Sequence, residues 1–428
     1  MSTRKPGWYR FAFFLGRAPS LTERQWRVLG LVAAVSFFEV YDMYLFTLNL
    51  KQIQSELGIS EANLGYLGSI VRSGAIFSVF IALAADWVGR RRMLLITIVI
   101  YTLLTGLTAL APTAEVFVGL QFFARAFAVA EAILATVVIV EEFDAHNRGW
   151  GVGALGAIQA CGAGAASILY GFVEVIPFGW RSLYAVGLIP LVLLAYWRRT
   201  LPETTRFADI STDIKRESGG VGSMLSPILS LVRDHRRRLG LLALVVFLTA
   251  LAGSTALFFA PKYLQDVHGW TPAGVALLTL VGGVFAVIGN PLAGWLSDKR
   301  GRRPVTAAFA FGMALFGVLF YSGSGIFLSG LWMGLIFFSL GVGVTESTYG
   351  AELFPTSKRT TASSARSIFS NIGAISGLFF VSLLYPVFES NWTSIVILSF
   401  VCVLTPVIVW VGFPETSQRE LEEIAPEE

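Results

Sequence analysis

Twelve long apolar runs follow one another along almost the whole chain, separated by polar segments. About 20 helical residues cross the ~30 Å hydrocarbon core of a bilayer, and each run comes close to or exceeds that length. Hydrophobic residues make up 55% of the chain, and its mean hydropathy of +0.68 is typical of a polytopic membrane protein. We therefore predict an all-α membrane protein with twelve transmembrane helices, at residues 28–50, 62–85, 93–111, 116–140, 150–173, 182–200, 239–262, 272–296, 304–323, 327–351, 362–386 and 393–413.

The basic residues fall mainly on one side of the predicted membrane. Of the 32 lysines and arginines, all but Lys51, Arg72, Arg125, Arg181 and Lys262 lie in or next to the N-terminal tail, the even-numbered loops and the C-terminal tail. Cytoplasmic segments carry this excess of positive charge, so we predict an integral protein of the plasma (inner) membrane with both termini cytoplasmic. The net charge of +4 then reflects topology, and we expect no nucleic-acid partner. Residues 1–27 have no pattern of a cleavable signal peptide.

Few residues of the chain suit a metal or a cofactor. Cys161 and Cys402 fall in different predicted helices, and His146, His235 and His268 are scattered over loops. No nucleophile paired with a base and no phosphate-binding loop is evident. We predict a protein that is not an enzyme, with no cofactor and no metal site.

Short motifs recur at a fixed distance. "DWVGRRR" begins at Asp86 and "DKRGRRP" at Asp298, 212 residues later (298 − 86), and the same offset carries Trp180 onto Trp392 and one "PET" onto another. Motifs that repeat in register indicate two copies of one six-helix unit. We predict an N-terminal tail (1–27), a first bundle (28–200), a cytoplasmic linker (201–238), a second bundle (239–413) and a C-terminal tail (414–428).

This repeat, with "GWLSDKRGRRPV" at 294–305, resembles the major facilitator superfamily. "EEFDAHNRG", "FGWRSLYAVGLIP", "AELFPTSKR" and "FPETSQRELEEI" are similar to its sugar-porter, organic-ion and synaptic-vesicle-type branches, and "EVYD" at 39–42 resembles its aromatic-acid:proton symporters. The resemblance covers nearly the whole chain. It implies a secondary transporter that works by alternating access.

Acidic and basic residues recur together on the predicted cytoplasmic side in both copies. Charge-assisted pairs there can hold the two halves together in one state and separate in another. An alternative is that the arginines only determine topology. We predict a cytoplasmic gate formed by Asp86, Gly89, Arg90, Arg91, Glu142, Arg148, Asp298, Gly301, Arg302, Arg303, Glu346, Glu352 and Arg359.

Glu39 and Asp42 lie in the middle of the first predicted helix, three residues apart and therefore on one face. An ionised residue at the centre of a membrane costs ~2.5–3.5 kcal/mol on insertion scales, so such residues pair or line a wet cavity. The resemblance implies that helices 1, 4, 7 and 10 line the central cavity and that Arg125 of helix 4 faces Asp42. We predict that protons are carried by Asp42, Glu39 and Glu131.

Protonation of Asp42 would free Arg125 to hold a substrate anion. Aromatic and amide side chains on the same predicted cavity helices could contact a flat substrate. We predict substrate binding by Arg125, Tyr41, Tyr44, Gln159, Phe258 and Tyr349. The role of Arg72 stays open.

The leading hypothesis is a monomeric proton symporter in the bilayer for a small organic anion, either an aromatic or another carboxylate. A proton-linked sugar or polyol porter is the alternative, because sugar porters carry a glutamine where Gln159 stands; however, helix 7 lacks their paired glutamines. A drug antiporter is disfavoured, because helix 5 lacks the Gly-Pro pair of that branch. A transporter-like ligand sensor would bind the ligand without moving it.

Overall fold

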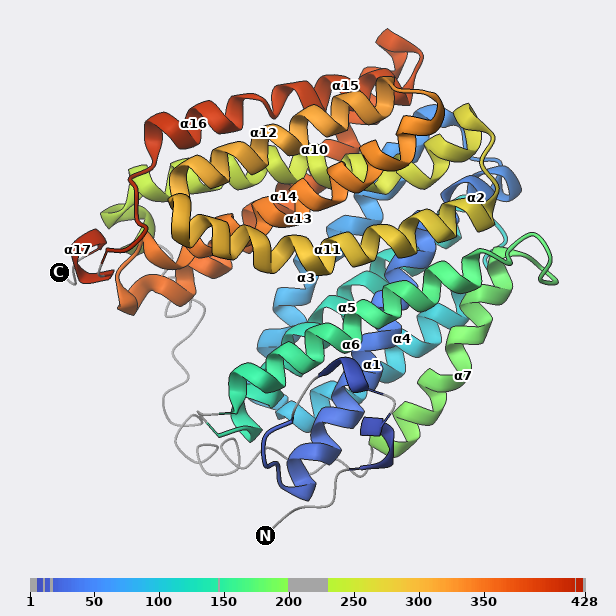
Figure 1. The fold of residues 1–428 in the computed structure, drawn as a ribbon. Coiled ribbons are helices and arrows are strands. Elements are labelled where there is room, and N and C mark those ends of the chain that lie inside the picture. The colour runs from blue at the N-terminus through green and yellow to red at the C-terminus, as the bar shows by residue number, and fades with distance from the viewer. Residues whose placement is uncertain are drawn as a thin grey trace. The chain divides into compact units, whose positions relative to one another are not determined.

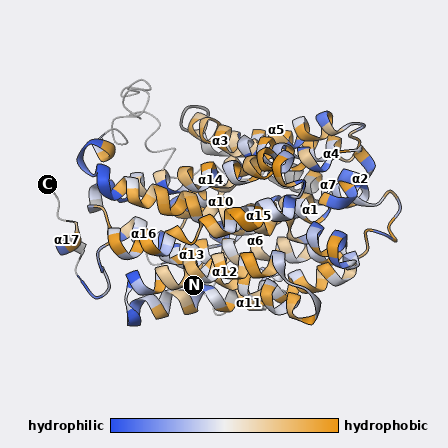
Figure 2. Cartoon of the chain, turned by 90° about the horizontal axis from the view of Figure 1, so that it is seen from above, coloured by the Kyte–Doolittle hydropathy of each residue, from blue (hydrophilic) through white to orange (hydrophobic). Residues whose placement is uncertain are grey.

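The computed structural model describes residues 6–10, 12–15, 18–144, 147–198, 230–419 and 421–425. Within these ranges every regular element is a helix (Figure 1). Ten of the described helices are long and apolar enough to cross a membrane, and Arg92–Thr108 is a shorter apolar helix. Hydrophobic residues extend along most of the helices, as Figure 2 shows. The predicted all-α membrane fold is confirmed.

The six predicted runs of the first half coincide with long helices. α1 begins at a capping box, in which the Thr22 hydroxyl accepts from the Gln25 amide and the Gln25 side chain accepts from the Thr22 amide. The helices of this half are α1 (Glu23–Leu48), α2 (Leu50–Leu57), α3 (Leu64–Val88), α4 (Arg90–Thr108), α5 (Ala114–Glu142), α6 (Arg148–Tyr170) and α7 (Trp180–Arg198), with short 3-10 turns at Gly7–Arg10, Phe13–Leu15 and Glu61–Asn63.

The second half repeats this order of helices. Its last predicted run is divided between two helices, because the α-helical pattern breaks at Cys402 and Val403. The helices are α10 (Arg236–His268), α11 (Pro272–Arg300), α12 (Arg302–Ser322), α13 (Leu328–Glu352), α14 (Arg359–Phe388), α15 (Asn391–Val401), α16 (Leu404–Gly412) and α17 (Leu421–Ile424), with 3-10 turns at Gly325–Phe327 and Thr356–Lys358. Most of the predicted linker, residues 201–229, lies outside the described residues.

The backbone shows the sequence repeat directly. Gly89 precedes α4 with φ 104° and ψ 141°, and Gly301, 212 residues later (301 − 89), precedes α12 with φ 105° and ψ 146°. Residues with a Cβ rarely adopt this positive-φ backbone conformation, so the same turn requires glycine at both positions. The two loops are therefore copies in conformation as well as in sequence.

Contacts between Cα atoms divide the described chain into two compact units. The first unit contains the described residues of 1–58 and 74–218, and the second contains those of 59–73 and 219–428. α3 thus contributes to both units. Its first residues belong to the second unit, where the Tyr66 amide donates to Ser382 Oγ of α14 at 3.0 Å.

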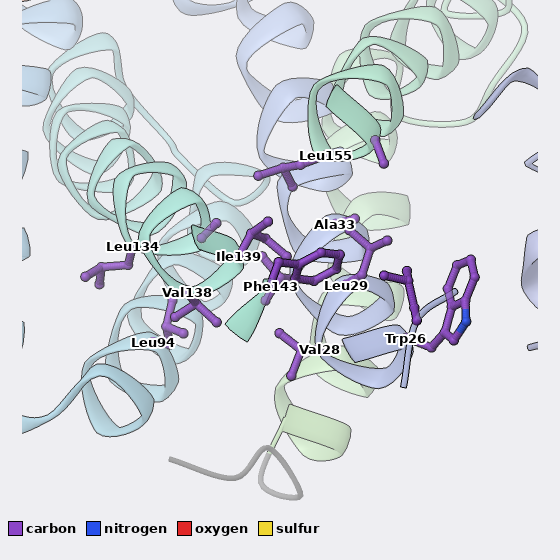
Figure 3. Close-up of a cluster of buried hydrophobic side chains, with 14 of the residues drawn as sticks. Trp26, Val28, Leu29, Ala33, Leu94, Leu134, Val138, Ile139, Phe143 and Leu155 are labelled. Atoms are coloured by element: carbon purple, nitrogen blue, oxygen red, sulfur yellow. The ribbon is translucent and has the colours of Figure 1, made fainter. Parts of the chain in front are cut away.

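The core of the first unit is built from the facing sides of several helices (Figure 3). Trp26 and Leu29 of α1 contribute, with Leu94 of α4, Ile139 of α5 and Leu155 of α6. These side chains lie near the first residues of α1, α4 and α6 and near the last residues of α5. The packing holds α1, α4 and α5 together, and these three helices carry the polar groups described next.

Candidate functional site

A cluster of buried charged side chains lies inside the first unit. Glu39 and Asp42 of α1 are 9% and 6% exposed, and Arg125 of α5 is partly buried. Arg125 interacts electrostatically with both acids. The three side chains therefore lie within electrostatic range of one another, although Arg125 forms no direct ion pair with any acid among the described residues. The predicted roles of Asp42, Glu39 and Arg125 stay predictions.

One polar atom of each group is buried without a hydrogen-bond partner in the described part of the chain: Oε2 of Glu39, Oδ1 of Asp42 and Nε of Arg125. Buried polar atoms in native proteins are nearly always paired, and an unpaired one calls for an explanation such as a functional role or a bound water or ion. The cluster therefore has free capacity to take up a proton and to donate hydrogen bonds to an anion.

Asp42 faces hydroxyl groups of α4. The Thr105 hydroxyl donates to Asp42 Oδ2 at 3.5 Å, and the Tyr101 hydroxyl lies beside the same carboxyl group. Tyr184 of α7 also lies within electrostatic range of Asp42. Asp42 thus has three hydroxyl-bearing neighbours from two other helices.

Glu131 of α5 is fully buried and accepts a hydrogen bond of 2.6 Å from the Thr97 hydroxyl of α4. It also interacts electrostatically with Glu39. The structure therefore gathers the three predicted proton-carrying acids in one unit. Thr97, Tyr101 and Thr105 were missed by the sequence analysis, although their spacing of four residues was a visible signal.

Two predicted substrate ligands on α1 differ in environment. Tyr41 is 3% exposed, and its hydroxyl donates to the Leu183 carbonyl of α7 at 2.8 Å, so it joins two helices. Tyr44 of α1 and Gln159 of α6 are partly buried.

A glycine of α6 allows this helix to approach α1 closely. A Cβ on Gly162 would lie 2.1 Å from the Phe37 carbonyl oxygen, so a larger residue would not fit beside the cluster.

The other predicted ligands belong to the second unit. Phe258 of α10 is 6% exposed and packs edge to face against Phe259. Tyr349 of α13 is fully buried in a hydrophobic core, where its hydroxyl donates to the Pro414 carbonyl at 3.2 Å. Their role in substrate binding stays a prediction.

Glu346 of α13 is a further buried acid. It is 5% exposed and accepts a hydrogen bond of 2.7 Å from the Thr249 hydroxyl of α10. Arg366 of α14 interacts with it electrostatically. Glu346 therefore connects three helices within the second unit, and its role in the gate stays a prediction.

The second copy of the repeated loop motif forms a dense charge cluster around Arg302. Its guanidinium pairs with Glu352 at 3.0 Å, contacts Asp298, and donates to Ser297 at 2.7 Å. Glu415 of the second "PET" motif accepts from the Arg302 amide at 2.8 Å and from the Arg303 amide at 3.2 Å. A carboxylate at a helix N-terminus stabilises the helix, so Glu415 anchors the C-terminal segment on α12.

Further charged residues of the second unit are Arg303, Arg359, Lys358 and Asp234. The Arg303 guanidinium stacks over the Trp410 ring at 4.8 Å from its centre, and Arg359 begins α14. Lys358 pairs with Asp234 at 2.6 Å. Hydrogen bonds from Lys358 and Arg233 lower the pKa of the Asp234 carboxyl below its usual value.

The corresponding part of the first unit is organised around Glu142. Arg24 forms two hydrogen bonds with its carboxylate, at 2.8 and 2.7 Å, and Gln25 donates to its carbonyl at 3.0 Å. Arg148 donates to the Phe143 carbonyl at 3.0 Å. Arg24 is a partner that the sequence analysis did not name. The side chains of the predicted gate residues Asp86, Arg90 and Arg91 lie outside the described residues.

No group of three or more histidines, cysteines or acids in the described ranges could hold a metal ion. Cys161 is exposed and Cys402 is buried, and both are free thiols.

Residues 32–351 match the sequence model of the Major Facilitator Superfamily, so the chain belongs to that family of membrane transporters and is not an enzyme. It is 24% identical to a Bacillus subtilis protein described as a niacin/nicotinamide transporter, NiaP, over 95% of this chain and 100% of that protein. It is 27% identical to the cis,cis-muconate transport protein of Acinetobacter baylyi, over 79% of this chain and 82% of that protein.

The inward-open structure of the xylose transporter XylE from Escherichia coli has the same fold. It superposes with a TM-score of 0.73 at 20% sequence identity, covering 94% of this chain and 99% of that one. At this identity the likeness concerns the fold alone.

Proposed function

We propose that this transporter carries a small organic anion together with a proton. The observation that supports this proposal is the buried cluster of Glu39, Asp42 and Arg125, in which the arginine is near two acids without a direct ion pair. An acid that takes up a proton loses its attraction for a neighbouring arginine, which then has more of its charge available for a substrate anion. Proton and anion binding are thereby coupled through adjacent groups.

A carboxylate is the proposed substrate class. Arg125 has a planar guanidinium that matches a carboxylate with two parallel hydrogen bonds. The names of the two relatives refer to niacin and cis,cis-muconate, which are small organic acids. Tyr44 of α1 and Gln159 of α6 are both partly buried. We propose them as further contacts for the aromatic or unsaturated part of the substrate.

We expect an acidic outside pH to drive uptake of such an anion. In proteoliposomes that contain the purified protein, radiolabelled nicotinate and cis,cis-muconate should accumulate more than about tenfold above their level without a gradient, because 1.4 kcal/mol of driving force corresponds to a factor of ten. Vesicles without protein and a protonophore are the controls. Equal uptake with and without the gradient contradicts symport.

The same assay separates the alternatives. Accumulation of xylose or a polyol in place of both acids would favour the sugar-porter reading, for which Gln159 is the supporting residue. Binding that raises the unfolding temperature without any uptake would favour a sensor, because a ligand stabilises the protein whether or not it is moved.

The proposed setting is the inner membrane with both termini cytoplasmic and the chain as a monomer. In this orientation the charge clusters around Glu142 and Arg302 lie at the cytoplasmic ends of their units. We propose that these clusters act as gate elements that rearrange during alternating access.

Glu352→Gln should slow transport about tenfold, because it removes the ion pair with Arg302 that we propose stabilises one transport state. It should change ligand affinity less than about threefold, because it leaves the cluster of Glu39, Asp42 and Arg125 intact. The Glu352 side chain is 14% exposed, whereas that of Asp298 is 64% exposed, so solvent screens the second pair more strongly. Asp298→Asn should therefore slow transport less. Transport rates and affinities measured for both variants check this order, and wild-type rates in both would contradict the gate.

A further inference from the structure

One face of α4 carries a line of buried hydroxyl groups. Thr97, Tyr101 and Thr105 are spaced by four residues and so point to the same side of the helix. Their exposed fractions are 0%, 1% and 2%. Such a line costs free energy in an apolar helix unless every hydroxyl finds a partner, so its partners are informative.

The two ends of the line contact carboxylates. At one end Thr97 donates to Glu131 Oε2 at 2.6 Å, and at the other Thr105 donates to Asp42 Oδ2 at 3.5 Å. Between them, the Tyr101 hydroxyl donates to the Phe38 carbonyl at 3.3 Å and lies beside both Asp42 and Thr105. Eight residues of helix rise about 12 Å, so the line spans more than a third of a ~30 Å hydrocarbon core.

Thr97 has two acceptors for its single proton. Besides Glu131, its hydroxyl oxygen lies 3.1 Å from the Leu94 carbonyl, one turn earlier in α4. When Glu131 is ionised, Thr97 donates to it. When Glu131 is protonated, the acid can donate to the Thr97 oxygen while Thr97 donates to Leu94. The local geometry therefore accommodates both protonation states of this acid.

The charged and titratable groups around the line come from each packed helix. α1 contributes Glu39 and Asp42, α5 contributes Arg125 and Glu131, and α7 contributes Tyr184. α6, which packs along α1, carries no carboxylate, amine or imidazole from residue 149 to residue 171. Glu39 interacts electrostatically with both Asp42 and Glu131.

We propose that the hydroxyl line of α4 is a proton relay between Asp42 and Glu131. Among the described residues no hydrogen bond joins Tyr101 to Thr97, and the Tyr101 hydroxyl donates to the Phe38 carbonyl, so the proposed relay includes one water molecule that bridges Tyr101 and Thr97. The Asp42 carboxyl passes its proton to the hydroxyls of Thr105 and Tyr101, the water carries a proton on to Thr97, and Thr97 releases its own proton to the Glu131 carboxylate, so the hydroxyls and the water are regenerated. Thr97, Tyr101 and Thr105 are positioning and relay residues. In the proposed orientation the relay leads from the outer half of the unit toward its cytoplasmic half. This inference rests on the proposed proton coupling.

The test removes hydroxyls and preserves shape. In Thr97→Val, Tyr101→Phe and Thr105→Val, accumulation of radiolabelled nicotinate or cis,cis-muconate driven by a pH gradient should fall at least about tenfold. Counterflow exchange of the same compound needs no net release of a proton and should stay within about twofold of the wild type. Thr97→Ser keeps the hydroxyl and should restore accumulation.

Thr136→Val is the matched control, because Thr136 is an exposed threonine of α5. Within the described part of the chain its hydroxyl donates to its own helix, at the Ala132 carbonyl. It should accumulate the compound as the wild type does. Unfolding temperatures of all variants show whether each protein is folded.

Three outcomes overturn the relay. Normal gradient-driven accumulation in all three hydroxyl variants would show that the proton takes another route, while the proposed symport stands. Loss of exchange together with accumulation in folded variants would make the line structural. If the wild type itself shows no response to the gradient, the proposed function and the relay both fail.

Discussion

Arg125→Ala should abolish measurable binding of nicotinate and cis,cis-muconate to the purified protein. Removing a charged donor from a buried site typically costs 2 kcal/mol or more, which weakens affinity roughly thirtyfold or beyond. Arg125→Lys keeps the charge but loses the two-pronged donor, so its affinity should lie between those of Arg125→Ala and the wild type. Isothermal titration calorimetry, together with the shift in unfolding temperature on adding each acid, measures the effect.

Arg27→Ala provides the matched control in the same unit. Arg27 pairs with Glu23 on an exposed surface of α1, where its side chain is 55% exposed. Its removal should leave affinity unchanged, because exposed pairs contribute little and lie outside the cluster. Unaltered binding in Arg125→Ala would place the anion site elsewhere in the molecule.

Asp42→Asn should eliminate gradient-driven accumulation while retaining anion binding and counterflow exchange. The amide imitates the protonated acid permanently, so the variant can hold the anion but can no longer take up and release the proton that drives net uptake. Uptake of the same two acids in proteoliposomes, with and without an acidic exterior, measures the first property, and exchange of labelled for unlabelled compound measures the second.

Glu39→Gln should show a weaker form of the same defect. Glu39 lies near Arg125, but in the described part of the chain the hydroxyls of Thr97 and Thr105 donate to Glu131 and Asp42 and not to Glu39. Glu115→Gln, at the exposed start of α5, should behave as the wild type. A full gradient response in Asp42→Asn would mean that another acid carries the proton, with Glu39 or Glu131 next to be tested.

Some parts of the site required the structure because the sequence pattern allowed several partners. Glu142 could have paired with any of several nearby arginines in the sequence, and the fold gives it Arg24, 118 residues away. Tyr41 was a candidate ligand by its place on α1, yet its hydroxyl is bound by the Leu183 carbonyl. Both contacts depend on how α1 packs against other helices, and helix packing is a long-range property.

The sequence by itself determined the membrane-spanning class, the two-copy organisation and the acids and arginine that gather in the first unit. These follow from local physics: hydrocarbon demands long apolar helices, a left-handed turn demands glycine at 89 and 301, and a charge in a membrane demands a partner. Tertiary structure alone decided which partner each polar group has. Threonine in an apolar helix commonly bonds to its own backbone, so the spacing of Thr97 and Thr105 could not show that α4 packs these hydroxyls against Glu131 and Asp42.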